Sequence, residues 1–171
     1  MNSVKIKVTS AACTEALAER LGARLEPGDC LAFYGDLGAG KTTFTRGLAR
    51  GAGYEGAVSS PTFVLMHIYE ARLPIYHFDA YRLQGSGDLF NIGADEYFEG
   101  DGAVCLEWSE RAEDILPAVR LELRLTYGEG DQADEVRYIE CTAHGGRGQE
   151  MAEILAEAAA GVEGAEVLTA A

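Results

Sequence analysis

The sequence predicts an α/β fold, and three observations support that prediction. A short apolar run at 31–34 leads through a glycine-rich turn into a segment of helical character that begins at Lys41. A second compact apolar run, at 103–106, ends at an acidic residue. Paired strand-like segments within 63–78 and 120–142 are joined by turns and indicate antiparallel hairpins. We therefore expect a mixed sheet with a parallel core and antiparallel hairpins.

The glycine-rich turn and the residues after it match the Walker A pattern G-x-x-x-x-G-K-[ST] between a buried strand and a helix. The N–H groups of such a loop converge on phosphate oxygens, and the helix N-terminus adds donors and positive charge. In this pattern Lys41 contacts the β- and γ-phosphates, and the Thr42 hydroxyl is a magnesium ligand. A chance glycine turn is the rarer alternative. We expect one continuous run to bind the phosphates of a nucleotide: Gly35, Asp36, Leu37, Gly38, Ala39, Gly40, Lys41, Thr42 and Thr43.

Composition predicts a globular cytoplasmic protein. The chain has 171 residues, of which 47% are hydrophobic, enough for one domain with a sizeable core. Its apolar runs are short and broken by charge, and its first residues lack the apolar stretch of a signal peptide, so no membrane association is expected. Scattered cysteines without a Cys-x-x-Cys pair predict buried free thiols in a reducing compartment: Cys13, Cys30, Cys105 and Cys141.

The net charge of the chain restricts the kinds of molecule that it can bind directly. The chain carries 28 acidic and 14 basic residues, for a net charge of -14. Such a surface repels a phosphate backbone, so we expect no direct high-affinity binding of nucleic acid. Lysine occurs only at Lys5, Lys7 and Lys41. One of three lysines therefore lies in the phosphate loop, which argues against a routine surface role for it.

The first expected strand and helix are predicted from alternating apolar and polar residues and from a helix-capping residue. Residues 3–8 alternate and predict a half-exposed strand, and Thr9 or Ser10 can cap a helix that ends near Leu21. Residues 26–29 form a turn before the phosphate-loop strand. The junction between the first strand and helix is a candidate cover for an adenine ring, and a purely scaffolding role is at least as good an interpretation.

The middle of the chain alternates short elements with turns. Pro61 forces an extended Ser-Pro-Thr-Phe segment, after which strands are expected at 63–69 and 72–78. Two short helices are expected next, at 88–93 and 95–99. An acidic and aromatic stretch indicates the second of them. Further expected elements are a strand at 103–106, a brief helix at 111–116 and hairpin strands at 120–127 and 135–142.

The character of the sequence changes after Ala143. We expect residues 1–143 to form a single domain and residues 144–171 to form an Ala/Glu-rich C-terminal helix with an acidic tail. The run His-Gly-Gly-Arg-Gly at 144–148 is interpreted as a helix breaker, with the helix at 149–160. The segment is expected to be loosely attached, with a disordered far end.

Two acidic residues at strand ends are candidates for catalysis. Nucleotide hydrolysis needs magnesium, a held water and charge stabilisation at the γ-phosphate. Glu107 follows the apolar run 103–106, which is the Walker B pattern with Glu in place of Asp, and Asp79 follows the run 75–78. We interpret Glu107 as a magnesium ligand, direct or through water, and Asp79 as the acid that orients the attacking water or the hydration shell. Which acid touches the metal stays open, and a solvent-facing carboxylate is the alternative for each.

Four further residues are ambiguous from sequence. Thr62 lies where nucleotide switches place a hydroxyl that senses the γ-phosphate, although an ordinary strand threonine is equally good. Arg82 could reach phosphate, with an ion pair as the favoured alternative. His77 is interpreted as a half-buried strand residue rather than a base. Trp108, the single tryptophan, is either a core residue or a lid.

Elimination favours ATP as the nucleotide. No lysine follows Lys41, so the guanine-reading Asn/Thr-Lys-x-Asp motif cannot occur, and no Asp-x-x-Gly switch is found. A small P-loop kinase is an alternative, but it needs an arginine-rich lid, whereas Arg72, Arg82 and Arg111 are scattered. A nucleotide-gated regulatory module is a further alternative.

Four segments together resemble one known family. GDLGAGKTTFTRGLA (35–49), SPTFVL (60–65), YHFDAYRL (76–83) and LEWSER (106–111) are similar, in order and spacing, to TsaE. That family is the small bacterial ATPase of tRNA threonylcarbamoyladenosine biosynthesis. The resemblance covers residues 4–142, and the segment 149–171 lies outside the motifs.

The resemblance implies a fold, a reaction and partners. The fold would be a three-layer sandwich of the P-loop NTPase type. The protein would bind ATP and Mg²⁺, hydrolyse ATP slowly alone, and act on the TsaB–TsaD pair, in which TsaD is the transferase. By motif position, the resemblance makes Lys41, Asp79 and Glu107 catalytic and Thr42 and Glu107 metal ligands. It also assigns switch-like positions to two residues: Thr62 and Trp108.

Overall fold

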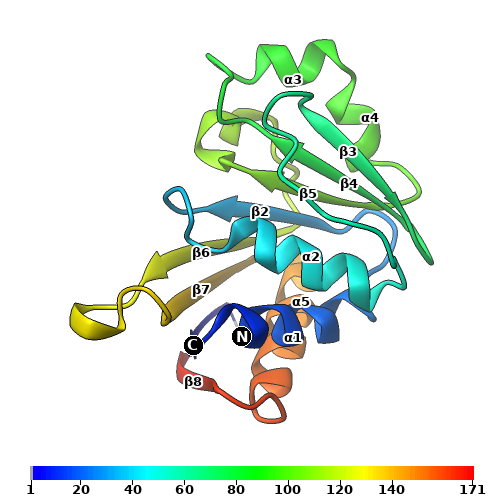
Figure 1. Cartoon of the computed structure of the whole chain (residues 1–171). Coiled ribbons are helices and arrows are strands. Elements are labelled where there is room, and N and C mark those ends of the chain that lie inside the picture. Colours follow the sequence, from blue (N-terminus) through cyan, green and yellow to red (C-terminus); the bar gives the residue numbers. More distant parts are fainter. Residues whose placement is uncertain (1) are drawn as a thin grey trace.

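One mixed sheet organises the molecule. The computed structural model describes residues 2–171, and the strand order in its eight-stranded sheet is β3-β4-β5-β2-β6-β7-β1-β8. Figure 1 shows the sheet running through the length of the molecule. The strands are β1 (Ser3–Val8), β2 (Cys30–Tyr34), β3 (Met66–Glu70), β4 (Pro74–Asp79), β5 (Ala103–Glu107), β6 (Arg120–Tyr127), β7 (Arg137–His144) and β8 (Ala165–Ala170).

The sheet has a parallel centre and antiparallel margins, as the sequence predicts. β2 runs parallel to both β5 and β6, and β4 runs parallel to β5. The β3–β4 and β6–β7 hairpins are antiparallel, and β1 pairs antiparallel with β7 and β8. In the parallel register Glu107 lies opposite both Asp79 and Phe33. The carboxyl ends of β4, β5 and β2 therefore meet at one edge of the sheet.

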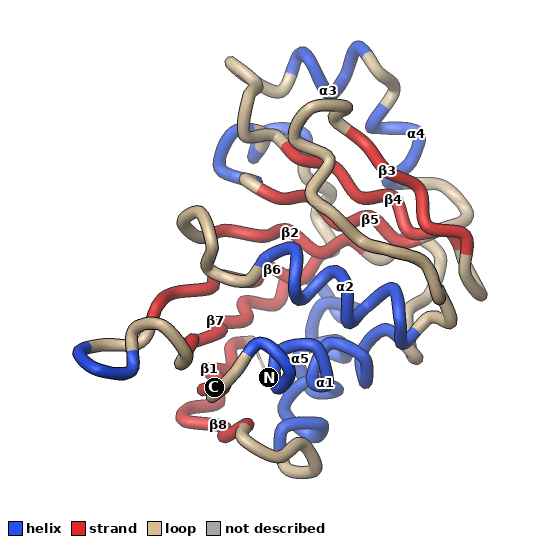
Figure 2. The backbone as a smooth tube through the Cα atoms, in the orientation of Figure 1, coloured by secondary structure: helices blue, strands red, loops and turns tan. Residues whose placement is uncertain are grey.

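Helices form layers on the two faces of this sheet. Figure 2 shows α1, α2 and α5 grouped together, with α3 and α4 at the other end of the molecule. Because successive side chains of a strand point to opposite faces, Leu31 and Phe33 pack with the first group while Cys30 packs with the second. The helices are α1 (Ala11–Gly22), α2 (Lys41–Gly51), α3 (Gly87–Asn91), α4 (Ala94–Phe98) and α5 (Gly145–Ala159).

The two layers have separate cores. The larger core joins α1, α2 and α5 to the sheet, and in it Phe33 meets Phe44 edge-on with ring centroids 5.6 Å apart. The smaller core joins α3 and α4 to β4 and β5 through residues such as Leu89 and Leu106. The predicted three-layer arrangement is therefore found over β4, β5 and β2.

Several predicted boundaries are corrected. The strand expected at 63–69 begins only at Met66, because residues 61–65 turn instead: the Leu65 N–H donates to the Pro61 carbonyl at 2.7 Å, and Leu65 has φ 69°. Phe63 is consequently 81% exposed. The strand expected at 135–142 is β7, two residues later. The brief helix expected at 111–116 is replaced by two 3₁₀ turns, at Ser109–Arg111 and Glu113–Ile115.

The expectation of a loosely attached C-terminal segment is wrong. α5 begins at Gly145, inside the presumed breaker, and buries Met151, Ile154 and Leu155 in the larger core. Arg147 donates from Nε and Nη2 to the buried Asp29 carboxylate at 2.9 and 2.8 Å. β8 pairs with β1, which brings the two ends of the chain together (Figure 1). These contacts make residues 145–170 part of the folded sheet and its helical layer.

The structure also defines the environment of the cysteines and the character of the helices. The four cysteines are buried and unpaired, and burial raises the pKa of the Cys30 and Cys141 thiols to about 12. None of the helices formed by residues 2–171 combines the length and apolar character that crossing a bilayer requires.

Candidate active site

The glycine-rich loop between β2 and α2 has the backbone that its sequence predicts. Gly35, Gly38 and Gly40 have φ values of 141°, 79° and 111°, which only glycine adopts without strain. At Gly35 a Cβ atom would lie 2.5 Å from the Leu125 carbonyl oxygen, so the loop also needs glycine for close approach. The Tyr127 hydroxyl donates to the Leu37 carbonyl and ties the loop to the end of β6. A glycine loop that leads into the N-terminus of an eleven-residue helix is suited to binding phosphate.

Lys41 lies inside this loop. Only 4% of the residue is exposed, and its Nζ donates to the Gly35 carbonyl and, at 3.0 Å, to that of Asp36. Nζ also lies 4.0 Å from the centroid of the Trp108 ring. Burial lowers the pKa of the Lys41 amine, and the Glu107 carboxylate opposes that shift. The first turn of α2 thus presents one cation surrounded by carbonyl oxygens and an aromatic face.

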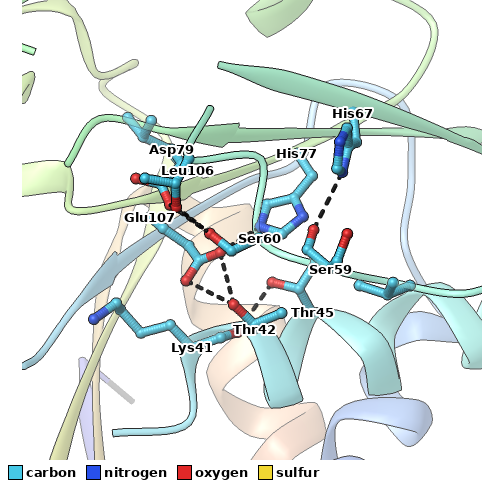
Figure 3. A network of polar contacts seen from close by, with 12 residues as sticks. Lys41, Thr42, Thr45, Ser59, Ser60, His67, His77, Asp79, Leu106 and Glu107 are labelled. Carbon is cyan, nitrogen blue, oxygen red and sulfur yellow. Dashed lines mark hydrogen bonds and ion pairs between the residues drawn. The ribbon is translucent and has the colours of Figure 1, made fainter. Parts of the chain in front are cut away.

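Thr42 and Glu107 face each other across the top of the sheet. The Thr42 hydroxyl lies 3.1 Å from each Glu107 carboxylate oxygen, and Glu107 is only 3% exposed (Figure 3). Glu107 is the last residue of β5, and Thr42 is the second residue of α2. The structure therefore brings together the two residues that the sequence predicts as metal ligands.

Asp79 ends the neighbouring strand and is held by the segment that follows α2. Its Oδ2 accepts from the Ser60 hydroxyl at 2.5 Å and the Thr62 hydroxyl at 2.8 Å, and its Oδ1 accepts from the Tyr81 N–H at 2.8 Å. Asp79 is 2% exposed, so it is not a solvent-facing carboxylate. Thr62 is in a turn rather than a strand, and its hydroxyl points to this acid.

Two ambiguous side chains are also placed. Trp108 follows Glu107 with φ 58°, a left-handed conformation that is uncommon for a bulky residue, and it packs on Tyr81 with ring centroids 4.9 Å apart. The Arg82 guanidinium lies over the Phe63 ring, 4.1 Å from its centroid, rather than in the predicted ion pair with an acid. Trp108 therefore lines the site, whereas Arg82 covers an exposed aromatic beside it.

These groups line one cavity of about 250 Å³, which has Lys41, Thr42, Asp79 and Glu107 in its wall. A second cavity of about 320 Å³ shares Gly38, Gly40 and Thr43 with the first and extends to Thr9 and Ser10. The junction of β1 and α1 therefore does lie beside the glycine loop. A larger open groove of about 1,370 Å³ between α1 and α5 also reaches Thr9 and Ser10, but neither the glycine loop nor the two acids line it.

Some of the residues that hold the two acids were not predicted from the sequence. His77 is fully buried rather than half-buried, and its Nε2 lies 2.6 Å from Glu107 Oε2. Ser60 and Tyr69 are the other residues missed, and both belong to the same polar network. One signal was available: in a strand that ends at Asp79, alternation puts His77 on the face of that acid.

The glycine loop between β2 and α2, with acids at the ends of two adjacent parallel strands, defines a protein with a P-loop-type α/β fold. The family model described as threonylcarbamoyl adenosine biosynthesis protein TsaE matches residues 8–136. The chain therefore belongs to the TsaE family, as its four motifs predict, and that family is named for tRNA threonylcarbamoyladenosine biosynthesis.

Individual relatives agree with this assignment. The tRNA threonylcarbamoyladenosine biosynthesis protein TsaE of Bacillus subtilis is 39% identical over 156 residues, which are 91% of this chain and 95% of that protein. The Streptomyces coelicolor TsaE is 42% identical over 134 residues, 77% of this chain and 90% of that one. The crystal structure of Bacillus subtilis YdiB matches with a TM-score of 0.77 and 36% identity, covering 91% of this chain and 95% of YdiB.

Proposed function

We propose that the protein is a magnesium-dependent ATPase that supports tRNA threonylcarbamoyladenosine modification by acting on a TsaB–TsaD complex, without being the transferase itself. The observation that carries the proposal is the grouping of Lys41, the Thr42–Glu107 pair and Asp79 around a single cavity next to the glycine loop. Each of these residues has a separate role in phosphoryl transfer to water.

Binding rests on the loop and on Lys41. Backbone N–H groups at 35–43 would hold the phosphates, and Lys41 would exchange its contacts with the Gly35 and Asp36 carbonyls for phosphate oxygens. Burial of the amine strengthens its attraction to a negative ligand because little water screens the charge. The adjoining cavity at Thr9 and Ser10 is where we place the adenine ring.

The donor set fits magnesium. Mg²⁺ prefers oxygen ligands and commonly takes one or two protein groups in addition to phosphate and water. Thr42 and Glu107 supply such oxygens from a buried position, and they would hold the ion directly or through water. When bound, the ion would neutralise charge on the β- and γ-phosphates. Asp79 would orient the attacking water once its contacts with Ser60 and Thr62 rearrange.

The partner and location complete the proposal. The printed names of the relatives concern biosynthesis of a modified tRNA nucleoside, whereas this chain carries a net charge of -14, which disfavours direct contact with tRNA. These two observations are compatible if TsaB and TsaD, as a protein pair, bind the tRNA and this chain acts on the pair. Four free thiols agree with a reducing, cytoplasmic location.

The test is ATP hydrolysis by the purified chain, with GTP as the control nucleotide, alone and with added TsaB–TsaD. We expect slow ATP turnover that requires Mg²⁺ and rises when the pair is added. Turnover that ignores the pair would refute the proposed partner and leave a P-loop ATPase. Transfer of phosphate to a small molecule, found in a substrate screen, would favour the kinase alternative.

A further inference from the structure

His77 lies behind the site, and none of the roles above uses it. Its ring is fully buried on β4, with Nε2 2.6 Å from Glu107 Oε2 and Nδ1 2.9 Å from the Tyr69 hydroxyl. Figure 3 shows the ring beside Glu107, on the far side of that carboxylate from Lys41. A histidine with partners at both ring nitrogens is held in one orientation, so it can in turn orient what it touches.

The contact with Glu107 fixes which nitrogen donates. A carboxylate oxygen accepts hydrogen bonds, so His77 Nε2–H is the donor in this contact with Glu107. The Thr42 hydroxyl is the other side-chain partner, 3.1 Å from both carboxylate oxygens. A Thr42 hydroxyl that binds a metal ion does so through an oxygen lone pair, so it keeps its proton for the carboxylate. His77 is the second side chain that holds Glu107 in its orientation.

Tyr69 extends the network to the segment after α2. Its buried hydroxyl lies 3.1 Å from the Ser59 carbonyl oxygen as well as 2.9 Å from His77 Nδ1. A phenol has one proton to donate, so Tyr69 can donate to His77 Nδ1 or to the Ser59 carbonyl oxygen, but not to both at once. The Ser59 carbonyl also lies 3.2 Å from His67 Nδ1, so it can keep a partner when Tyr69 turns to His77.

The same segment holds the second acid. Ser60 and Thr62 donate to Asp79, while Ser59 is linked through Tyr69 and His77 to Glu107. We propose that His77 is a positioning residue for Glu107 and that, through Tyr69, it couples the orientation of this carboxylate to the 59–62 segment. The proposal rests on the ATPase role assigned above, and it adds that the two acids and this segment respond together.

The experiment compares variants that cut the network at different points. His77→Leu removes both ring nitrogens, His77→Gln restores an N–H donor toward Glu107, and Tyr69→Phe removes one hydroxyl. The matched control is Tyr76→Phe, which removes the hydroxyl bonded to Asp101 at 2.6 Å, away from the site. Readouts are ATP turnover against Mg²⁺ concentration, amide hydrogen exchange at 59–65 in nucleotide-free protein, and thermal unfolding.

We expect His77→Leu to lower kcat by about 10- to 100-fold and to raise the half-saturating Mg²⁺ concentration by about 10-fold, as removal of outer partners of metal ligands does. Exchange at 59–65 should accelerate in His77→Leu and Tyr69→Phe. His77→Gln should recover most of the loss in kcat, and Tyr76→Phe should leave every readout at its wild-type value except thermal stability.

Other outcomes discriminate sharply. Wild-type Mg²⁺ dependence and wild-type exchange in a folded His77→Leu variant would overturn the proposal and leave His77 as a core residue. Absence of turnover in the wild type would refute the ATPase role alone, since exchange in nucleotide-free protein still decides the coupling. If His77→Leu does not fold, Tyr69→Phe decides, and unchanged exchange at 59–62 in that variant overturns the coupling.

Discussion

β5 and β7 belong to the same sheet but to different environments. All five residues of β5 are buried, whereas in β7 only Ile139 and Cys141 are buried and they alternate with exposed residues. Helical layers cover both faces at β5, whereas at β7 the larger core, with α5, lies on one face. On the open face of β7, Glu140 pairs with Lys5 at 3.2 Å with both side chains substantially exposed. The chemically distinctive groups all lie at the covered end.

The difference between the two strands shows that charged side chains need fixed hydrogen-bond partners where they are buried, and not where water solvates them. Glu107 and Asp79 are nearly removed from water, and a buried carboxylate is tolerated only with hydrogen-bond partners. Each acid accordingly has such partners, from Thr42 and His77 in one case and from Ser60 and Thr62 in the other. On the open face water solvates the charges, so their arrangement has little energetic consequence.

The largest effect of a single substitution on ATP turnover is expected at the phosphate loop. Lys41→Ala should lower ATP turnover by about 1,000-fold, because it removes a preorganised charge from the transition state. Thermal unfolding should change little, because the amine's target is a ligand and the freed carbonyls can meet water. Lys7→Ala, in β1, is the matched control and should keep wild-type turnover. Full activity in Lys41→Ala, measured with phosphate release, would reject the site.

A core substitution in α5 should lower stability and leave turnover unchanged, which is the opposite of the effect expected for Lys41→Ala. Leu155 is fully buried in α5, so Leu155→Ala should lower the free energy of unfolding by about 2–5 kcal/mol. Turnover per folded molecule should stay unchanged at temperatures where the variant is folded. Leu168→Ala, at an exposed position of β8, should cost less than about 0.5 kcal/mol. Urea titration monitored by Trp108 fluorescence measures both, and a wild-type midpoint in Leu155→Ala would mean that α5 is loosely held after all.

Local sequence was enough for much of this fold. β1 at 3–8 and β6 at 120–127 have the predicted bounds because each alternates cleanly between apolar and polar residues. The site residues predicted from motifs lie together because parallel strands end at one edge of the sheet. The charges that the motifs require are therefore close in space without being close in sequence.

The errors arise where tertiary contacts override local signals. The glycines at 145–148 suggest a breaker, but at Gly148 a Cβ atom would lie 2.4 Å from the Arg120 carbonyl oxygen. Glycine there permits α5 to approach β6, which no local pattern reveals. β8 is stabilised by pairing with β1, so its residues carry little signal of their own. The bond between His77 and Glu107 depends on the register of β4 with β5, which only the assembled sheet defines.

Glu107→Gln sharpens the comparison within the covered end. The amide keeps the size of the side chain but removes its negative charge. Magnesium-dependent turnover should therefore fall, with a loss of about 2–4 kcal/mol of transition-state stabilisation. The measurement is kcat as a function of Mg²⁺ concentration, with Asp79→Asn as the parallel variant. A wild-type Mg²⁺ titration in Glu107→Gln, combined with a shifted one in Asp79→Asn, would transfer the metal to Asp79.

The smallest effect is expected on the open face. Lys5 and Glu140 lie on adjacent strands with side chains 38% and 47% exposed, so their ion pair is solvated and screened by salt. A double-mutant cycle with Lys5→Ala and Glu140→Ala should give a coupling energy of about 0.2–1 kcal/mol that falls as salt increases. Turnover should be wild-type in all three variants. A coupling of several kcal/mol that resists salt would show that this face is shielded from water, and the contrast between the two ends of the sheet would then lose its physical basis.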